Sequence, residues 1–256
     1  MTGFDLATAR AYVAGAELPE APPGLEGGPA TPQIVFDKAQ QQAVLVGANV
    51  VSFDTGVEAD FREAISDSAL LAQLAANKAV PGASDPIRWF EVYFQVLNNI
   101  GWVAQVIDNA RYEVKFDGME VHEAILDVVK IFLGPSPAAL ALVIQTLDSL
   151  KKMQADSPLI TLFEKNSQKA ELARFQFTYI RQQPDGGLSG EAMAFTLSAE
   201  QTITQLLFFK LSKARSKMER RLGTLSINRA ALSGLRQQVR ARVMPFMSDF
   251  VAQLDI

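Results

Sequence analysis

The sequence predicts an α+β fold, with a helical first two-thirds around one buried helix and an antiparallel or mixed sheet after it. Three observations predict this fold: an apolar helical pattern over Asp85–Asp108, an alternating strand pattern that begins at Arg174, and an amphipathic closing helix after Asn228. Hydrophobic residues make up 48% of the 256 residues and charged residues 20%, values that are typical of a folded globular chain.

The segment Asp85–Asp108 is expected to be the central helix. Asp85 can cap its N-terminus, and Pro86 suits the first turn because a proline lacks the N–H that would be unpaired there. Polar residues form only a narrow stripe, and both tryptophans of the chain, Trp89 and Trp102, lie in this segment. A helix that is apolar over most of its circumference is usually buried on several sides. We therefore expect Trp102 in the core.

The start of the chain is expected to be separate from the body. Residues 17–32 are rich in Pro and Gly and indicate a linker, so we expect residues 1–32 to form a flexible arm and residues 33–256 a single globular domain. The first residues lack the basic-then-apolar order of a classical secretory signal. That pattern favours a cytoplasmic protein or one exported by a non-classical route.

Local signals predict the remaining elements before Arg174. We expect helices over Thr31–Val46 and Glu58–Lys78, strands over Asn49–Phe53 and Arg111–Phe116, a helix over Val121–Leu133, and further helices that begin at Ser136-Pro137 and Ser157-Pro158. Gly134-Pro135 separates the helix over Val121–Leu133 from the helix that begins at Ser136-Pro137.

The C-terminal part is expected to form an antiparallel meander. Its strands are predicted from Arg174, over Ala192–Leu197, Ile203–Leu211 and Gly223–Ile227, with a turn at residues 184–187. Asn228 should cap the closing helix, whose apolar stripe runs from Leu232 to Leu254, with a kink at Pro245. The strands near Asn49 and Arg111 could join the sheet and make it mixed.

Charge is distributed unevenly along the chain. Residues 1–173 hold 12 basic and 22 acidic side chains, whereas residues 174–256 hold 12 basic and 6 acidic ones. We expect six basic residues to contact a membrane or partner: Lys210, Lys213, Arg215, Lys217, Arg220 and Arg221. The alternative interpretation is that this basic part docks on the acidic first part of the same chain. Nucleic-acid binding is disfavoured because exposed aromatic residues are not interleaved with the basic ones.

No motif for catalysis, metal or cofactor binding stands out. The chain has no cysteine, and its one histidine, His122, begins an apolar helix, where a capping or surface role is more common than a catalytic one. The acidic cluster from Asp54 to Asp67 lies at a helix start, where carboxylates complement the helix dipole. We predict no catalytic residue, no cofactor and no metal site.

The segment Ile131–Leu147 is free of charge and is interrupted by Gly134-Pro135. It is too short and too interrupted for a membrane-spanning helix, which needs about 20 apolar residues. Two interpretations stay open: a core hairpin, or a segment that inserts into a bilayer after a conformational change.

These patterns lead to two hypotheses about function. The first is a non-enzymatic interaction protein, membrane-active or toxin-like, that acts at an anionic membrane or a partner surface. The second is a small-ligand-binding protein or hydrolase with a carboxylate-based pocket beside the central helix. The segments Asn98–Trp102 and Leu206–Lys210 resemble segments of uncharacterised bacterial proteins and imply no activity.

Overall fold

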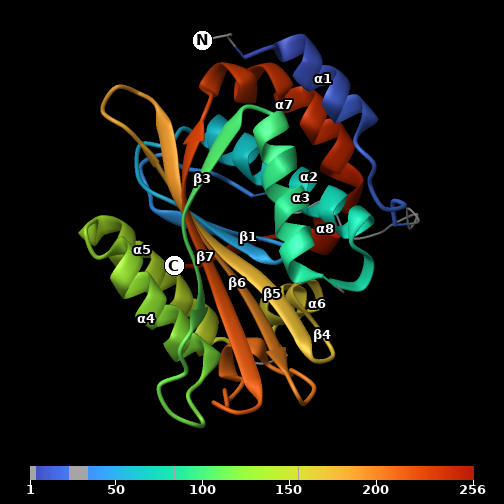
Figure 1. Cartoon of the computed structure of the whole chain (residues 1–256). Helices are drawn as coiled ribbons and strands as arrows, with labels where there is room; N and C mark the ends of the chain where they lie inside the picture. Colours follow the sequence, from blue (N-terminus) through green and yellow to red (C-terminus); the bar gives the residue numbers. More distant parts are fainter. Residues whose placement is uncertain (1–3, 23–33, 84, 155) are drawn as a thin grey trace.

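The computed structural model describes residues 4–22, 34–83, 85–154 and 156–256, and a mixed sheet lies at its centre (Figure 1). Within these residues the sheet has eight strands in the order β3-β7-β6-β5-β2-β1-β8, with β4 beside β5. All pairs are antiparallel except β2 with β5. The strands are β1 (Gln42–Val46), β2 (Asn49–Phe53), β3 (Trp102–Tyr112), β4 (Gln168–Lys169), β5 (Leu172–Gln182), β6 (Leu188–Ala199), β7 (Ser216–Ile227) and β8 (Val251–Leu254).

Helices cover both faces of the sheet. The α-helices are α1 (Leu6–Gly15), α2 (Ala59–Ala79), α3 (Pro86–Asn99), α4 (Val121–Leu133), α5 (Pro137–Lys152), α6 (Pro158–Ser167), α7 (Arg229–Val243) and α8 (Met247–Phe250). Short 3-10 helices are η1 (Pro81–Ala83), η2 (Leu206–Phe208) and η3 (Met244–Phe246). Helices α1, α2, α3 and α7 lie on one face, and the α4–α5 hairpin lies on the other (Figure 1).

Side chains that alternate along the strands pack into two separate cores, one on each face of the sheet. On β5, Ile180 packs into the core under α2, α3 and α7, while Phe175 and Phe177 pack into the core under α4, α5 and α6. Successive side chains of a strand point to opposite faces, so one sheet serves both layers. The predicted α+β fold and the mixed sheet are confirmed.

The start signals of several helices act as predicted. The side chains of Asp85, Ser157 and Asn228 each accept a hydrogen bond from a backbone N–H in the first turn of α3, α6 and α7. Helix α4 has a capping box, in which the Glu120 and Glu123 side chains pair with each other's backbone N–H groups. Local chemistry therefore determines where these helices begin.

The predicted central helix is wrong in two respects. Helix α3 ends at Asn99, and Gly101, with φ +93°, turns the chain into β3, so Trp102 lies in a strand. A Cβ at Gly101 would lie 2.4 Å from Cβ of Ala231, so the close approach of α7 also requires glycine here. The helix buried on several sides is α2, whose residues are buried almost continuously from Ala64 to Ala76.

Other elements also differ from the prediction, among them β7, which begins at Ser216 instead of Gly223. The helix predicted over Thr31–Val46 is wrong: its described residues before Gln42 form no helix, and Gln42–Val46 is a strand that pairs with both β2 and β8 and has all five residues buried. The strand expected over Arg111–Phe116 stops at Tyr112. Ile203–Leu211 contains η2 instead of a strand. The closing helix ends at Val243, and η3, α8 and β8 follow, because the chain must turn back to pair with β1.

The N-terminal helix α1 packs on α7. Ala9 and Val13 are buried, and Arg10 donates a hydrogen bond to the carbonyl of Gly234. Most of the predicted linker, from residue 23 on, lies outside the described residues. The division into an arm of residues 1–32 and a domain of residues 33–256 stays a prediction.

Candidate functional site

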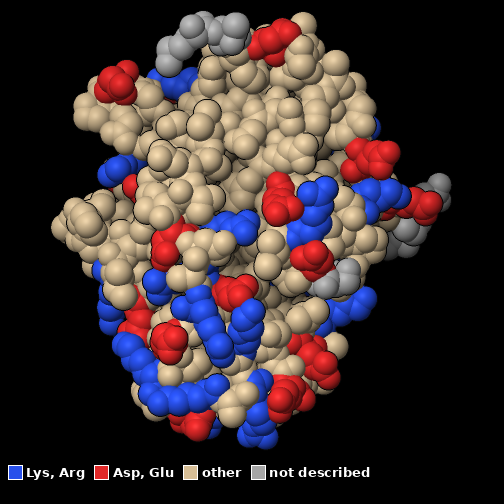
Figure 2. All heavy atoms as spheres, viewed as in Figure 1, with Lys and Arg blue, Asp and Glu red and all other residues tan. Residues whose placement is uncertain are grey.

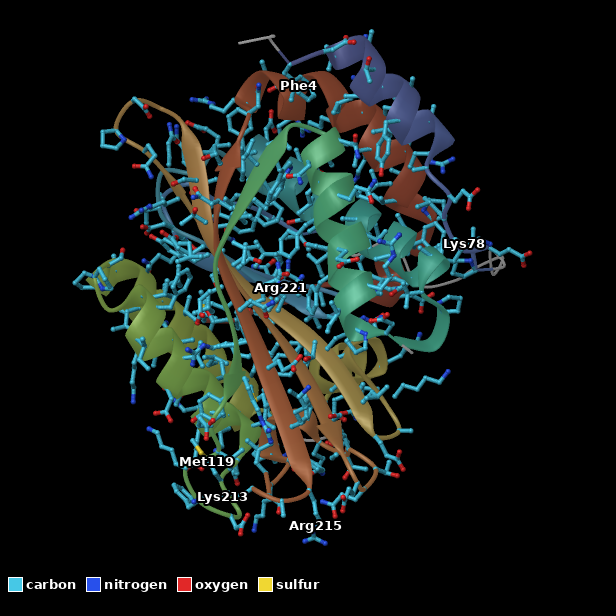
Figure 3. The ribbon with its side chains drawn as sticks, viewed as in Figure 1. Phe4, Lys78, Met119, Lys213, Arg215 and Arg221 are labelled. Atoms are coloured by element: carbon cyan, nitrogen blue, oxygen red, sulfur yellow. The ribbon has the colours of Figure 1, made fainter. Side chains whose placement is uncertain are left out.

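The six predicted contact residues occupy one loop and the strand that follows it. Lys210, Lys213 and Arg215 lie between η2 and β7, while Lys217, Arg220 and Arg221 lie on β7. Figure 3 shows Lys213 and Arg215 at one end of the sheet, with Arg221 further along β7 near the middle of the molecule. The six residues therefore do not form a single flat face.

Backbone hydrogen bonds hold the basic loop, residues 209–216, against the start of α4. The N–H of Leu211 donates to the carbonyl of Met119 over 2.7 Å, and the N–H of Gly118 donates back to Leu211 over 2.8 Å. The N–H of Lys213 donates to Oδ1 of Asp117 over 2.7 Å. The basic loop and the base of the α4–α5 hairpin are thus in contact, although they lie far apart in the sequence.

Two of the six residues are neutralised by neighbours. Nε of Arg220 lies 3.0 Å from Oδ2 of Asp108 on β3, and Nζ of Lys217 lies 2.6 Å from Glu219. No ion pair joins the other four, Lys210, Lys213, Arg215 and Arg221, to an acid in the described part of the chain. Four unpaired cations thus belong to the C-terminal part.

The other basic residues after Arg174 contribute to the fold. Arg236 and Arg240 of α7 pair with acids of α2, and Arg181 pairs with Glu191. Arg229 and Arg242 donate to the carbonyls of Gly186 and Ala16. Arg174 stacks on Trp89, 4.5 Å from the ring centroid, and donates to Asn77. Ion pairs between the basic and the acidic part are therefore made by α7 and Arg220, whereas the side chains of the basic loop make none within the described residues.

A cavity of about 390 Å³ lies at the end of the sheet, where the basic loop, the residues that directly follow β6 and the turn at Asp117-Gly118 line it. Lys210 and Arg215 line it together with two acids, Asp117 and Glu200. Figure 2 shows basic and acidic side chains interspersed over the lower half of the visible face, whereas few charges lie on the upper half. The charge of this cavity is balanced, so it is not by itself an anion site.

The predicted acidic cluster has mostly structural roles. Glu58 pairs with Lys38, and Asp54 accepts a hydrogen bond from the Tyr179 hydroxyl over 2.7 Å. Asp67 is buried, and Oδ1 accepts a hydrogen bond from Arg240 over 2.9 Å. Burial raises the pKa of Asp67 to about 6, although Arg240 opposes the shift.

The charge-free segment Ile131–Leu147 forms the tip and one arm of the α4–α5 hairpin (Figure 1). Its inner side is buried: Leu133, Leu142 and Leu147 pack into the core against the sheet. Its outer side is exposed, with Ile131 73% accessible. Among the helices that the structure describes, none is long and apolar enough to cross a membrane.

A groove follows α3 along β6 and β7. Cavities of about 200 Å³ and 260 Å³ lie in it, and Arg221 lines the first. The acids that line these cavities include Glu91, which is paired with Arg88, and Glu219, which is paired with Lys217. Trp89 and Tyr93 are buried in the core instead of lining the groove. A third acid, Asp85, lines the second cavity and caps α3, so a carboxylate-based pocket beside the predicted central helix would have to use acids that already have partners.

His122 is buried and does not cap the helix or face solvent, contrary to the predicted role. It is the second residue of α4, and its Nε2 lies 3.6 Å from Oδ1 of Asp148 on α5. In the described residues no group of His, Asp or Glu side chains is arranged to hold a metal ion.

Comparison with known proteins assigns no family. No protein-family model matches the chain, and no curated protein matches it. Three solved structures show a distant likeness. A delta-endotoxin is 16% identical, with 81% of this chain and 91% of that chain covered and a TM-score of 0.41. The activated Cyt2Ba monomer from Bacillus thuringiensis subsp. israelensis is 19% identical (57% and 86% covered, TM-score 0.33), and the Evf virulence factor is 11% identical (80% and 82% covered, TM-score 0.34). Likenesses at this level do not identify a function.

Proposed function

We propose that this chain is a non-enzymatic protein that binds an anionic membrane surface through its basic loop and carries a membrane-inserting hairpin beside that loop. The observation that supports the proposal best is the pairing of the basic side chains. Eight of the twelve basic side chains after position 173 have an ion-pair or hydrogen-bond partner, while those of Lys210, Lys213, Arg215 and Arg221 have no ion pair within the described residues. Each unpaired cation near an anionic bilayer contributes about 1 kcal/mol of attraction.

The α4–α5 hairpin is the apolar element of the proposal. It begins at Val121, whose N–H donates to the carbonyl of Phe209, the first residue of the basic loop. Few side-chain hydrogen bonds tie it to the sheet: Tyr112 donates to Asp127 over 2.7 Å, and Ser52 lies 3.1 Å from Thr146. Loss of these bonds during release would cost on the order of 1 kcal/mol each.

Release of the hairpin would transfer apolar side chains from the core to lipid. Burial of each Leu or Val contributes about 1.5–3 kcal/mol relative to water. Acyl chains supply a comparable apolar environment, so the hairpin would regain most of that stabilisation in a bilayer. The charge-free run from Ile131 to Leu147 avoids the cost of placing an ionised side chain there.

Vesicle pelleting tests the proposal. The protein is expected to pellet with vesicles that contain phosphatidylglycerol and to remain in the supernatant with purely zwitterionic vesicles. Added salt should release it, because charges are screened within about 8 Å at physiological ionic strength. Equal pelleting with both vesicle types, or binding that salt does not weaken, would argue against a role for the basic loop.

A further inference from the structure

The only histidine of the chain lies buried inside the hairpin that the proposed function requires to move. His122 is 5% exposed, on the first turn of α4, and α4 packs against α5 and η2. Its Nε2 has no hydrogen-bond partner in the described structure. The distance of 3.6 Å from Nε2 to Asp148 exceeds that of a hydrogen bond. The imidazole therefore fills space between the helices as a neutral group.

Charged groups of both signs surround the imidazole. On its own helix, Glu120 and Glu123 form the capping box. On α5, Asp148 is half-exposed, and Lys151 pairs with Glu120 over 2.5 Å. Lys151 also lies 5.7 Å from the ring centroid of Phe208 in η2, a helix with no titratable side chain of its own. The basic loop adds Lys210, whose backbone bridges that of Glu120.

Protonation would place a second cation inside this arrangement. The nearest acceptor for the buried Nε2–H of the imidazolium would be the half-exposed Asp148, 3.6 Å away and beyond hydrogen-bonding distance, and the imidazolium would lie near Lys151. A buried charge without a hydrogen-bonding partner is strongly disfavoured. We infer that His122 is an acid-sensitive latch, whose protonation loosens the packing of α4 on α5 and releases the hairpin toward a bilayer. This inference rests on the function proposed above, because it concerns regulation of the same hairpin.

The direction in which the pKa of His122 is shifted agrees with its buried position. Burial lowers the pKa of His122 below its ordinary value, and Lys151 lowers it further, while Asp148 and the two glutamates oppose the shift. A released hairpin would hold its histidine in water and bind a proton more readily. The docked hairpin is therefore fully stabilised above the ordinary histidine pKa and loses stability as the pH falls through that value.

The latch can be tested without lipid. Hydrogen-exchange protection of the α4 and α5 amides, corrected for the intrinsic exchange rate, should fall about three- to tenfold between neutral pH and about pH 5, while that of α2 does not fall. In His122→Gln and His122→Phe, which cannot gain the charge, hairpin protection should not fall as the pH is lowered. Hairpin protection that falls equally in the wild type and in these variants would overturn the latch.

The wild-type protein gives a second measurement that does not depend on how the variants fold. Because the chain has one histidine, its imidazole proton signals can be titrated without ambiguity. A midpoint below that of a histidine in a short peptide is expected, and a midpoint at or above that value would overturn the latch.

A vesicle experiment separates the latch from the proposed function. The chain has no cysteine, so Ile131→Cys provides a unique site for a polarity-sensitive dye on the exposed hairpin tip. With phosphatidylglycerol vesicles, dye emission should rise severalfold more at about pH 5 than at neutral pH, and His122→Gln should remove this difference. Protection that falls without a rise in emission would support the latch and contradict insertion. Emission that rises equally at both pH values would support insertion and overturn the latch.

Discussion

Arg220 on β7 and Asp108 on β3 form an ion pair across the edge of the sheet, with Nε and Oδ2 3.0 Å apart. The next residue along the strand, Arg221, points to the other face and has no acidic partner within the described residues. The two arginines are adjacent in the sequence and differ in role, because successive side chains of a strand alternate between its faces. One contributes to the fold, and the other is available to a ligand or surface.

Charge reversal at these two positions should therefore have different effects. Arg220→Glu places a carboxylate opposite Asp108 and is expected to lower the free energy of unfolding by about 1–2 kcal/mol. Arg221→Glu is expected to change it by less than about 0.5 kcal/mol and, because Arg221 lies outside the basic loop, to weaken pelleting with anionic vesicles less than a reversal within the loop does. Urea unfolding of the two variants, measured side by side, checks the first part. Equal destabilisation by both would contradict the assigned roles.

The raised pKa of Asp67 predicts an unusual pH dependence of the free energy of unfolding. Burial raises its pKa in the folded state to about 6, above the ordinary value of 3.8. The folded state therefore binds this proton more tightly than the unfolded state, and the resulting stabilisation, present at acid pH, is lost as the pH rises through about 6. The shift corresponds to about 3 kcal/mol between the two limits.

Asp67→Asn tests this interpretation. The amide oxygen can still accept the hydrogen bond from Arg240, and the cost of burying an ionised carboxylate is removed. We expect the variant to be at least as stable as the wild type at pH values well above 6, and its stability to fall less between acid and neutral pH. Urea denaturation at several pH values measures both effects. A strongly destabilised variant at neutral pH would show that the ion pair with Arg240 outweighs burial.

Trp102 should contribute to the core although it lies in a strand. It is 3% exposed and packs in the core under α2, α3 and α7. Trp102→Ala is expected to lower the free energy of unfolding by about 3–5 kcal/mol, as removal of large core aromatics does. The neighbouring Val103 is 64% exposed, so Val103→Ala is a matched control with an expected change below about 0.5 kcal/mol. An unchanged melting temperature for Trp102→Ala would contradict its place in the core.

Local signals were sufficient to predict part of the fold. Helix α4 has the predicted bounds Val121–Leu133, and Gly134-Pro135 marks its end. Strand β2 also has its predicted bounds, Asn49–Phe53. These signals lie within a few residues of the element that they limit, so they can be read without knowledge of the tertiary structure.

Other elements depend on distant partners and could not be predicted. Strand β1 is buried because β2 and β8 pair with it from both sides, and β8 lies about 200 residues away in the sequence. The end of α3 depends on the approach of Ala231 to Gly101. Local propensity carries no information about either contact, and tertiary packing overrides it.

The same limit applies to the candidate site. Charge counting alone singled out the six basic residues, but it could not separate Arg220, whose partner Asp108 lies 112 residues earlier, from the unpaired Arg221. It also could not place the basic loop against Asp117 and the start of α4. The sequence also did not show which side of the hairpin is exposed. In the structure Ile131 lies on the exposed side, and the opposite side is buried against the sheet.

The most direct test of the proposed function compares two double charge reversals. Lys213→Glu with Arg215→Glu alters the basic loop, while Lys78→Glu with Lys169→Glu alters two lysines that have no ion pair with a described acid. Figure 3 shows Lys78 away from Lys213 and Arg215. Both variants have the same formal net charge, so non-specific repulsion from anionic lipid is matched.

The measurement is the fraction of each variant that pellets with phosphatidylglycerol vesicles at low salt. The proposed function predicts that the basic-loop variant loses at least about tenfold in affinity, since four units of charge change beside the bilayer, while the control variant stays within about threefold of the wild type. Equal losses in the two variants, or undiminished pelleting of the basic-loop variant, would contradict membrane binding through the basic loop.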